Sequence, residues 1–378
     1  MNMFQLAWKQ LKLDRWRTLL TAIALGGVIA VILILEGFEQ GQYYQLEQLV
    51  LNRKADLIAT QSGVNNFIAV RSSIPQFSRA EVESVEGIIN AHPITSLPII
   101  YNKNNIRTPV YVLVYDTWGG PSSIIRGKHI KKGNDIVIDI SLAKKYNLKV
   151  GDKFFVTDFE FKISGFTKEA AFMMPLAFIS YDGMLDLFLE SEIAPDLSTF
   201  PLLSYMLLEI DPAFDRKKIQ QQIEARSPFV DVFTPSQIAE RDKNMGKTFY
   251  APIIGLLVSV AYIIGMLVVG LIMYSDIRSR IKSFAILKAL GFPFTKLFQA
   301  VVFQSLFLLL LAIPIGAIFA QSFAIFIHNI FPIYLFQIFS PNVFFQSVFA
   351  SLIFAFIGAM IPLRSIQRTD PLLAFQGE

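Results

Sequence analysis

A long apolar run near the N-terminus is the first clear feature in the pattern of hydrophobic and polar positions. No side chain between Thr18 and Leu35 is ionisable. As a helix, residues 19–38 would measure about 30 Å, which matches the hydrocarbon core of a bilayer. A cleaved signal peptide is the alternative, but the run is long for one, and residues 36–40 offer no small-x-small cleavage site. We therefore predict a transmembrane helix at 19–38.

Further apolar runs fill most of the last third of the chain. One uncharged stretch extends from Phe249 to Tyr274. Between Lys296 and Arg364 there is no Lys, Arg, Asp or Glu, which leaves room for two more spans joined by an uncharged loop. The pattern therefore predicts spans at 249–274, 297–320 and 342–363, with a loop at 321–341.

The charged residues are divided between two sets of segments. Residues 1–18, 275–296 and 364–378 hold 11 basic and 4 acidic residues, whereas the rest of the chain holds 23 basic and 26 acidic ones. The positive-inside rule places the N-terminal segment 1–18, the loop 275–296 and the tail 364–378 in the cytoplasm. It places residues 39–248 outside. The net charge of +4 thus reflects topology, and we expect no nucleic-acid partner.

Residues 39–248 must form a folded domain, because structureless connections of about 210 residues do not occur in compact proteins. Residues 136–138 are a short β-branched run, and residues 154–163 alternate apolar and polar side chains as half-buried strands do. Residues 141–146 suit one or two helical turns. The predicted fold class is an α-helical membrane protein with four transmembrane helices and a large mixed α+β extracytoplasmic domain inserted between the first and second helices.

The flanks of this domain have helical patterns that adjoin the spans. Apolar side chains in residues 46–50 keep helical spacing, so the first helix is expected to continue outwards as a stalk. Thr234 and Gln237 form a capping-box pattern, and Pro235 suits the first helical position. A helix from there through the second span would be about 60 Å long, with a kink at Pro252. The alternative is a short external helix that is broken from the span.

Catalytic and metal-binding patterns are missing from the sequence. Without cysteine there can be no disulfide, thiolate zinc site or cysteine nucleophile. Residues 246–248 look like the end of a phosphate-binding loop, but Arg241 stands where that motif needs glycine. The three histidines, His92, His129 and His328, are far apart and have no carboxylate at ligand spacing. We therefore predict that the chain is not an enzyme.

The predicted spans contain uncharged polar residues and almost no ionisable ones. The only Lys, Arg, Asp or Glu in the predicted spans is Glu36, near the outer end of the first span. Pumps and proton-coupled carriers usually keep ionisable residues within the bilayer, so a proton-driven carrier is disfavoured. Small residues at every fourth position allow close helix packing, as in Ala22/Gly26/Ala30 and Ala312/Gly316/Ala320.

The predicted cytoplasmic loop has an amphipathic pattern that Gly291 and Pro293 terminate. Two interpretations remain open for it. One is an interfacial helix that lies on anionic lipid, and the other is a docking helix for a cytoplasmic partner. The apolar face consists of Ile277, Ile281, Phe284 and Leu287, beside the basic Arg278, Lys282 and Lys288.

This loop resembles the coupling segment of the FtsX-like and MacB-like permeases of ABC transporters, over residues 283–292. The variant in 284–292 is more similar to the permeases of the cyanobacterial heterocyst-glycolipid exporters, the DevC-like group. The C-terminal residues 362–371 resemble the family's P-x-R-R-A-x-R-x-D-P pattern, and residues 125–166 resemble its outer-domain pattern. Ser283 departs from the family, which often carries Glu there. The similarity extends over the whole chain.

The resemblance implies a permease subunit in the plasma membrane, multi-pass, with both termini cytoplasmic. It implies a separate ABC ATPase subunit, and ATP and Mg²⁺ would bind to that partner, with no cofactor in this chain. It also implies a homodimer, and often a periplasmic adaptor that reaches an outer-membrane duct. The residues expected to contact the ATPase are Phe284, Leu287, Lys288, Ala289 and Gly291.

The leading functional hypothesis is an exporter permease that transmits ATP-driven conformational change to its extracytoplasmic domain. Its cargo would be a lipid, a glycolipid, a peptide or a drug-like molecule that is exported or extracted from the membrane. One alternative is an FtsX-like regulatory transmitter that controls an extracytoplasmic hydrolase without moving a substrate. A second is a membrane-anchored binding protein that has no ATPase.

Overall fold

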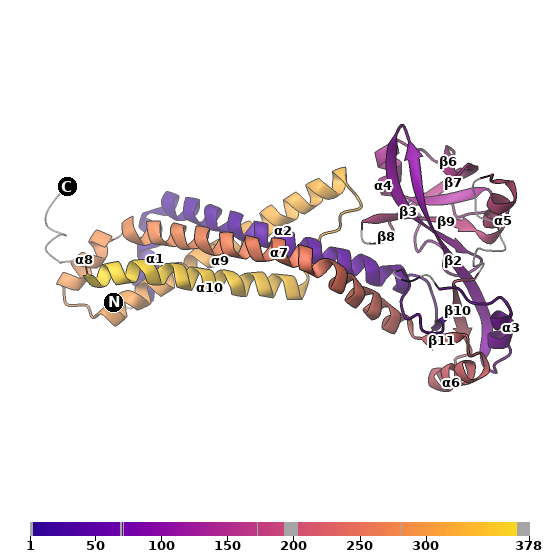
Figure 1. Ribbon diagram of the computed structural model, residues 1–378. Coiled ribbons are helices and arrows are strands. Elements are labelled where there is room, and N and C mark those ends of the chain that lie inside the picture. Colours follow the sequence, from indigo (N-terminus) through magenta and orange to yellow (C-terminus); the bar gives the residue numbers. More distant parts are fainter. Residues whose placement is uncertain are drawn as a thin grey trace. The chain divides into compact units, whose positions relative to one another are not determined.

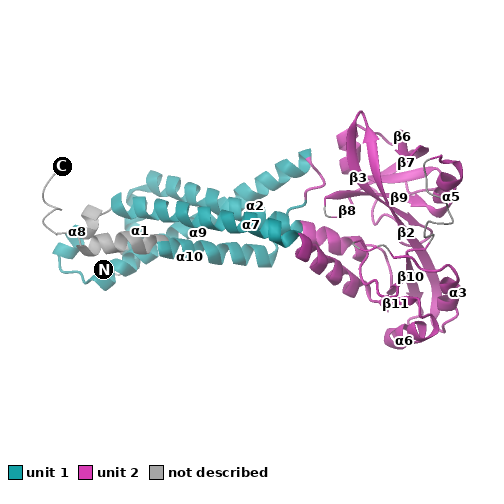
Figure 2. Ribbon diagram, viewed as in Figure 1, with its two compact units in different colours: residues 1–41, 250–330, 335–378 teal, residues 42–249, 331–334 magenta. Residues whose placement is uncertain are grey.

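The computed structural model describes residues 3–68, 70, 72–171, 173–192, 203–279 and 281–368. The chain divides into two compact units, which Figure 2 distinguishes by colour. The membrane unit comprises residues 1–41, 250–330 and 335–378. The outer unit comprises residues 42–249 and 331–334. The fold class is the predicted one, because a large mixed α and β unit is inserted after the first long apolar helix.

Among the described residues, three helices are long and apolar enough to cross a membrane: α2 (Arg15–Leu51), α7 (Pro235–Ser279) and α9 (Phe294–Ile330). The last expected span coincides with α10 (Pro341–Arg368), whose described side chains form a shorter apolar stretch that ends at Ile357. The short helices α1 (Met3–Leu13) and α8 (Ile281–Ala289) complete the unit (Figure 1).

The loop expected at 321–341 is shorter in the structure. Helix α9 continues through residues 321–330, whose side chains include no Gly or Pro to stop it. The helix ends at Ile330, just before the Phe331-Pro332 pair, because the residue before a proline is driven out of the helical region. The connection in the structure therefore consists of residues 331–340.

Both long helices next to the inserted domain extend beyond their apolar spans. Helix α2 continues to Leu51, so the predicted continuation of the first helix beyond its apolar span is confirmed. Helix α7 starts at Pro235 and passes through Pro252 as one helix of 45 residues, so the alternative of a broken helix is wrong. The capping box is confirmed. The backbone N–H of Thr234 donates to the side chain of Gln237 at 2.9 Å, and the N–H of Gln237 donates to the Thr234 hydroxyl at 3.3 Å.

The predicted small-residue faces bring α2 and α9 together within the membrane unit. A Cβ added at Gly26 would lie 2.8 Å from Cγ2 of Ile315. One added at Gly316 would lie 2.8 Å from the carbonyl oxygen of Gly26. Neither position has room for a larger side chain, so these glycines set the distance between the two helices.

A mixed sheet of 11 strands forms the framework of the described outer unit, in the order β11-β1-β10-β2-β3-β9-β5-β7-β4, with β6 paired to β7 and β8 to β9 (Figure 1). The pairs β3–β9 and β5–β7 are parallel, and the others are antiparallel. The strands are β1 (Leu57–Gln61), β2 (Ile88–Lys103), β3 (Ile106–Tyr115), β4 (Arg126–Gly127), β5 (Asp135–Asp139), β6 (Lys153–Val156), β7 (Phe159–Thr167), β8 (Ala170–Ala171), β9 (Met174–Ser180), β10 (Tyr205–Ile210) and β11 (Val230–Phe233).

The two faces of this sheet contact different helices. On one face, Leu49 of α2 and Ile238 of α7 pack against strand residues such as Ile58 and Phe178. The opposite face carries two separate hydrophobic clusters. One contains helices α4 (Ile140–Tyr146) and α5 (Tyr181–Glu190), and the other contains α3 (Phe77–Glu83) and α6 (Arg216–Arg226). The stalk face and the two-cluster face are therefore separated by a single layer of strands.

The local predictions in the middle of the outer unit are confirmed. Strand β5 covers the β-branched run, α4 covers the predicted short helix, and β6 and β7 alternate buried and exposed side chains. Between α4 and β6, Asn147 has φ 51° and Gly151 has φ 98°. These positive φ angles favour Asn and Gly, which explains why this turn could be located from the sequence.

Candidate functional site

Helix α8 positions the residues predicted to contact an ATPase. Leu287 is half-buried against a hydrophobic cluster that includes Ile277, Leu297 and Val301. Lys288 is half-buried and Ala289 is exposed. Gly291 ends the helix in a left-handed conformation with φ +83°, and the N–H of Phe292 returns to the carbonyl oxygen of Leu287 at 3.2 Å.

The side chain of the remaining predicted contact, Phe284, lies outside the described residues. Two exposed apolar residues of the same segment were not among the predicted contacts. Ile286 is 47% exposed and Leu290 is 70% exposed, and four residues separate them, so they lie on one face of the helix end. The i, i+4 spacing of Ile286 and Leu290 could have identified this pair from the sequence. The apolar stripe through Leu287 has the same kind of spacing and was favoured instead. Leu287 packs within the chain, whereas Ile286 and Leu290 form an exposed apolar pair.

The end of α2 is joined to the outer unit by a fully buried arginine. Arg53 is 0% exposed and lies two residues after the helix. Its Nε donates to the carbonyl oxygen of Leu49 at 3.0 Å, and its Nη1 donates to those of Gly119 and Gly120 at 2.8 and 2.9 Å. Its Nη2 forms an ion pair with Glu169. Burial lowers the pKa of Arg53, and the Glu169 carboxylate partly offsets this shift.

A network of hydrogen bonds continues from Glu169 into the sheet. Its carboxylate accepts from the N–H and the hydroxyl of Ser122 at 2.6 and 2.9 Å, and its backbone N–H donates to Asp139 at 2.9 Å. Asp139 also caps α4 by accepting from the N–H of Ser141. Burial raises the pKa of Asp139 to about 6, although its hydrogen bonds oppose this shift. Arg53 thus connects α2 to the helix that covers the far face of the sheet.

Helix α7 is joined to the outer unit by a buried carboxylate, Asp242, which is 4% exposed. Its two oxygens accept from the backbone N–H of Phe67 at 3.0 and 3.1 Å. The carbonyl oxygen of Phe67 in turn accepts from the hydroxyl of Tyr205 in β10 at 2.9 Å. Asp242 stands four residues after the buried Ile238, and this helical spacing was a signal that could have identified it. No such signal marks Arg53.

In the membrane unit, Glu36 joins three helices. It is 6% exposed and accepts hydrogen bonds from the hydroxyl of Tyr262 in α7 and, at 2.7 Å, from that of Ser347 in α10. Both carboxylate oxygens are therefore engaged by neighbouring helices. The side chain of Glu36 thus links α2 to both α7 and α10.

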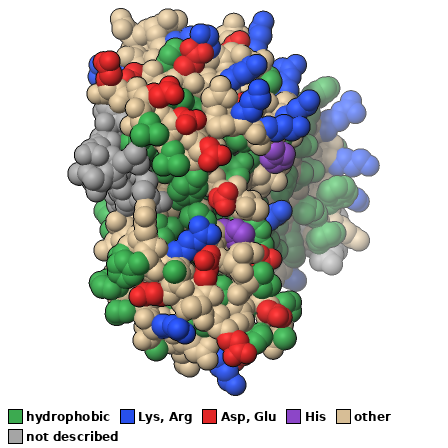
Figure 3. Space-filling model, turned by 90° about the vertical axis from the view of Figure 1, so that its right-hand side faces the viewer, with side chains coloured by type: hydrophobic (Ala, Val, Ile, Leu, Met, Phe, Trp, Pro, Cys, Tyr) green, Lys and Arg blue, Asp and Glu red, His purple; other side chains and the backbone are tan. Residues whose placement is uncertain are grey.

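Charged side chains are unevenly distributed over the outer unit. Figure 3 shows Lys and Arg side chains gathered on one part of the face in view.

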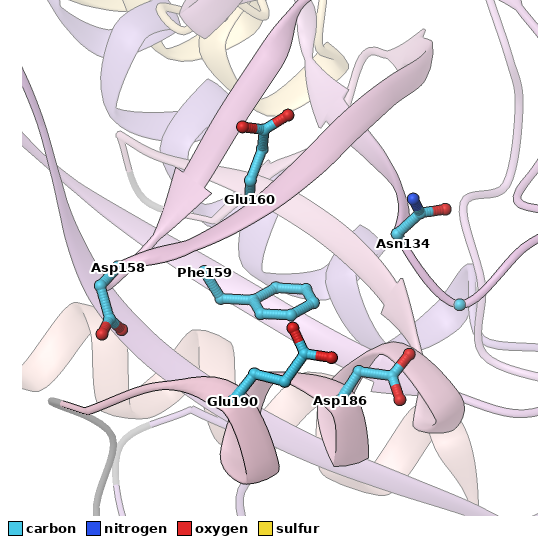
Figure 4. A pocket seen from close by; sticks show the side chains of 7 residues that line it. Asn134, Asp158, Phe159, Glu160, Asp186 and Glu190 are labelled. Atoms are coloured by element: carbon cyan, nitrogen blue, oxygen red, sulfur yellow. The ribbon is translucent and has the colours of Figure 1, made fainter.

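A hollow of about 520 Å³ is lined by Asp158, Glu160, Asp186 and Glu190 around Phe159 (Figure 4). Glu160 is paired with Lys153 at 2.8 Å. In the described part of the chain, no group of three or more His, Asp or Glu residues could hold a metal ion.

Comparison with known proteins places this architecture in a family. The model of the MacB-like periplasmic core domain matches residues 18–226, and that of the FtsX-like permease C-terminal matches residues 255–371. The uncharacterized ABC transporter permease Rv0072 of Mycobacterium tuberculosis is 20% identical over 98% of this chain and 99% of its own length. The uncharacterized ABC transporter permease Rv2563 of the same organism is 20% identical over 96% of each chain.

Among solved structures, the extracellular domain of the noncanonic ABC-type transporter YknZ from Gram-positive bacteria has a TM-score of 0.36 and 10% identity. It covers 48% of this chain and 100% of that chain. The family evidence comes from the sequence models, because the periplasmic core model alone matches more than half of this chain. The chain therefore belongs to the FtsX/MacB-like family of ABC transporter permeases, which are non-catalytic membrane subunits.

Proposed function

We propose that this permease transmits ATP-driven movement from a separate ATPase subunit to the outer unit, and thereby exports or extracts a lipid, a glycolipid, a peptide or a drug-like molecule. ATP and Mg²⁺ would bind to the partner. The end of α8 and the residues after it would form the contact with the ATPase, with Leu287, Lys288, Ala289 and Gly291 shaping it and Ile286 and Leu290 facing the partner.

The observation that carries this proposal is the continuity of α2 and α7. Each helix has residues in both units, and each is anchored in the outer unit through one buried charged side chain, Arg53 or Asp242. Since a helix is stiff along its axis, a displacement at its cytoplasmic end would reach the sheet through these anchors. The hydrogen bonds of Glu36 would make α2, α7 and α10 move together.

The finer features of this proposal come from the charge pattern and the family resemblance. Both termini and α8 would lie in the cytoplasm, because these segments hold most of the positive-inside bias. The permease would act as a homodimer in the plasma membrane, with an adaptor and an outer-membrane duct in organisms that have one. Residues 284–292 favour the DevC-like group within the family.

The contact with the ATPase can be tested with Leu290→Asp. Leu290 is 70% exposed, so the substitution should leave the fold intact while placing a charge in the proposed contact. Co-purification of the ATPase subunit from membranes should fall at least about tenfold, because an unpaired carboxylate buried on binding is costly. Leu13→Asp is the control, at a leucine in the N-terminal segment that is 82% exposed. Undiminished co-purification with Leu290→Asp would contradict the proposed contact.

A further inference from the structure

A second cavity of the outer unit lies on the face of the sheet opposite the stalk. Its volume is about 420 Å³. Its lining includes Pro93 of β2, Arg79 of α3, and Tyr181, Met184 and Leu185 of α5. Helix α3 belongs to one of the two hydrophobic clusters on this face and α5 to the other. The cavity therefore lies in the cleft between the two helical covers.

The lining of this cavity is mainly apolar. Leu185 is 41% exposed, whereas Met184 is fully buried and Leu203 is 4% exposed, so Leu185 provides most of the aliphatic surface that a ligand could reach. Small-molecule sites are typically clefts of about 300–1,000 Å³ with apolar walls and a few placed polar groups, and they often lie between domains. The cavity has the size and the lining of such a site.

Two opposite charges also line the cavity, Arg79 and Asp116. Within the described residues the guanidinium of Arg79 is paired with Glu83, through Nε at 2.9 Å, and not with Asp116. Burial raises the pKa of Tyr181, its hydrogen bond to Thr95 lowers it, and the charges of Arg79 and Asp116 shift it in opposite directions. Both charges therefore act on the polar end of the cavity at Tyr181.

From this combination we infer that the cavity between α3 and α5 binds a single-chain zwitterionic amphiphile. The alkyl chain packs against Leu185 and the ring of Tyr181. The anionic group of its head is bound by Arg79, and the cationic group by Asp116. Because the two sides of the cavity belong to different hydrophobic clusters, the bound molecule bridges them. The binding test below needs neither the ATPase nor transport, so it can fail or succeed independently of the proposed function.

Cysteine labelling of the full chain in lipid nanodiscs tests this site. The chain contains no cysteine, so Leu185→Cys introduces a unique thiol at the opening of the cavity. Leu189→Cys is the control, since Leu189 is 74% exposed on the same helix and does not line the cavity. The probe is N-octyl-N,N-dimethylglycine below its micelle-forming concentration. At saturation it should slow maleimide labelling of Leu185→Cys at least about tenfold, because bound ligands lose most of their exposed surface.

The head group is tested with octanoate and octyltrimethylammonium, which carry the same chain with one charge each. Each should bind about fivefold more weakly than the zwitterion, the effect of one lost exposed charge pair. Adding Arg79→Gln or Asp116→Asn to Leu185→Cys should remove the advantage of the zwitterion. Equal slowing at Leu189→Cys, no slowing by the zwitterion, or equal slowing by all three probes would overturn the inference. Stronger protection by trileucine, a zwitterion with a peptide backbone, would overturn the assignment to an alkyl chain.

Discussion

Two ionisable side chains are buried where α2 and α7 pack on the sheet, and both have hydrogen-bond partners, although burial raises the pKa of Asp242 to about 7. Arg53 has three carbonyl oxygens and Glu169, while Asp242 has the N–H of Phe67 at both of its oxygens. In a low-dielectric interior such groups stabilise a fold only while their partners are present. Each anchor is therefore sensitive to the loss of a single partner.

Arg53→Met should destabilise the outer unit by about 3–5 kcal/mol, because it leaves Glu169 buried without its counter-charge. The double variant Arg53→Met/Glu169→Gln should recover part of this loss, since no buried charge then remains unpaired, although the carbonyl oxygens of Leu49, Gly119 and Gly120 still lack their donor. Lys153→Met, which breaks the exposed pair with Glu160, is the control and should change stability by less than about 1 kcal/mol. Chemical unfolding of the full chain in detergent measures all three. A double variant no more stable than Arg53→Met would contradict this account.

Asp139 should make the stability of the outer unit depend on pH. Its pKa is about 6 in the folded chain against an ordinary value of 3.8, so the folded state holds the proton more tightly. The protonated Asp139 side chain therefore stabilises the folded state. This contribution is fully present below pH 3.8 and is lost as the pH rises through about 6. Asp139→Asn should reduce the slope of the stability profile over this range, and the slope that remains is expected from Asp242, whose pKa burial raises to about 7. Thermal unfolding between pH 4 and pH 8 is the measurement, and an unchanged slope in the variant would refute the assignment.

At the scale of elements, most helices and strands could be predicted because their signals are local. The capping box at Thr234, the turn at Asn147 and Gly151, and the alternation in β6 and β7 each depend on a few neighbouring residues. The strand order could not be predicted, since β1 lies between β10 and β11 far along the chain. The same limit applies to the partners of Arg53, because Glu169 is 116 residues away.

The α8 segment shows why a helical pattern alone did not identify its outward face. Leu287 belongs to a predicted apolar stripe, but it packs against Leu297 and Val301 of α9 in the same chain. The sequence pattern shows that a face is apolar and does not show what covers it. Only the tertiary packing separates Leu287 from the exposed Leu290.

The close packing of α2 and α9 predicts the effect of one added methyl group. Gly316→Ala should weaken the membrane unit by about 1–3 kcal/mol, because the new Cβ would lie 2.8 Å from the carbonyl oxygen of Gly26 and 2.9 Å from Cβ of Ile29. Gly255→Ala, in α7, is the matched control, because no atom lies within 4 Å of its added Cβ. Unfolding in mixed micelles measures the stability of the two variants. Equal stability of the two variants would show that the helices are not in contact at these glycines.

For the whole molecule, the arrangement of the outer unit suggests how a movement of the stalk would act. The ends of α2 and α7 pack on one face of the sheet, and the two helical covers with the cleft between them lie on the other. A rearrangement of α2 against α7 would change the twist of the strands between them, and hence the distance between α3 and α5. The central claim is therefore that ATP binding on the partner alters the cleft in the outer unit.

Pulsed electron paramagnetic resonance on the complex of permease and ATPase tests this claim most directly. Phe77→Cys and Leu189→Cys carry the spin labels on α3 and α5, and both positions are exposed in a chain without other cysteines. The distance distribution between the labels should differ between the nucleotide-free complex and the complex with a non-hydrolysable ATP analogue. The difference should vanish when Leu290→Asp is added. Identical distributions in both nucleotide states, in a complex that hydrolyses ATP, would contradict the account.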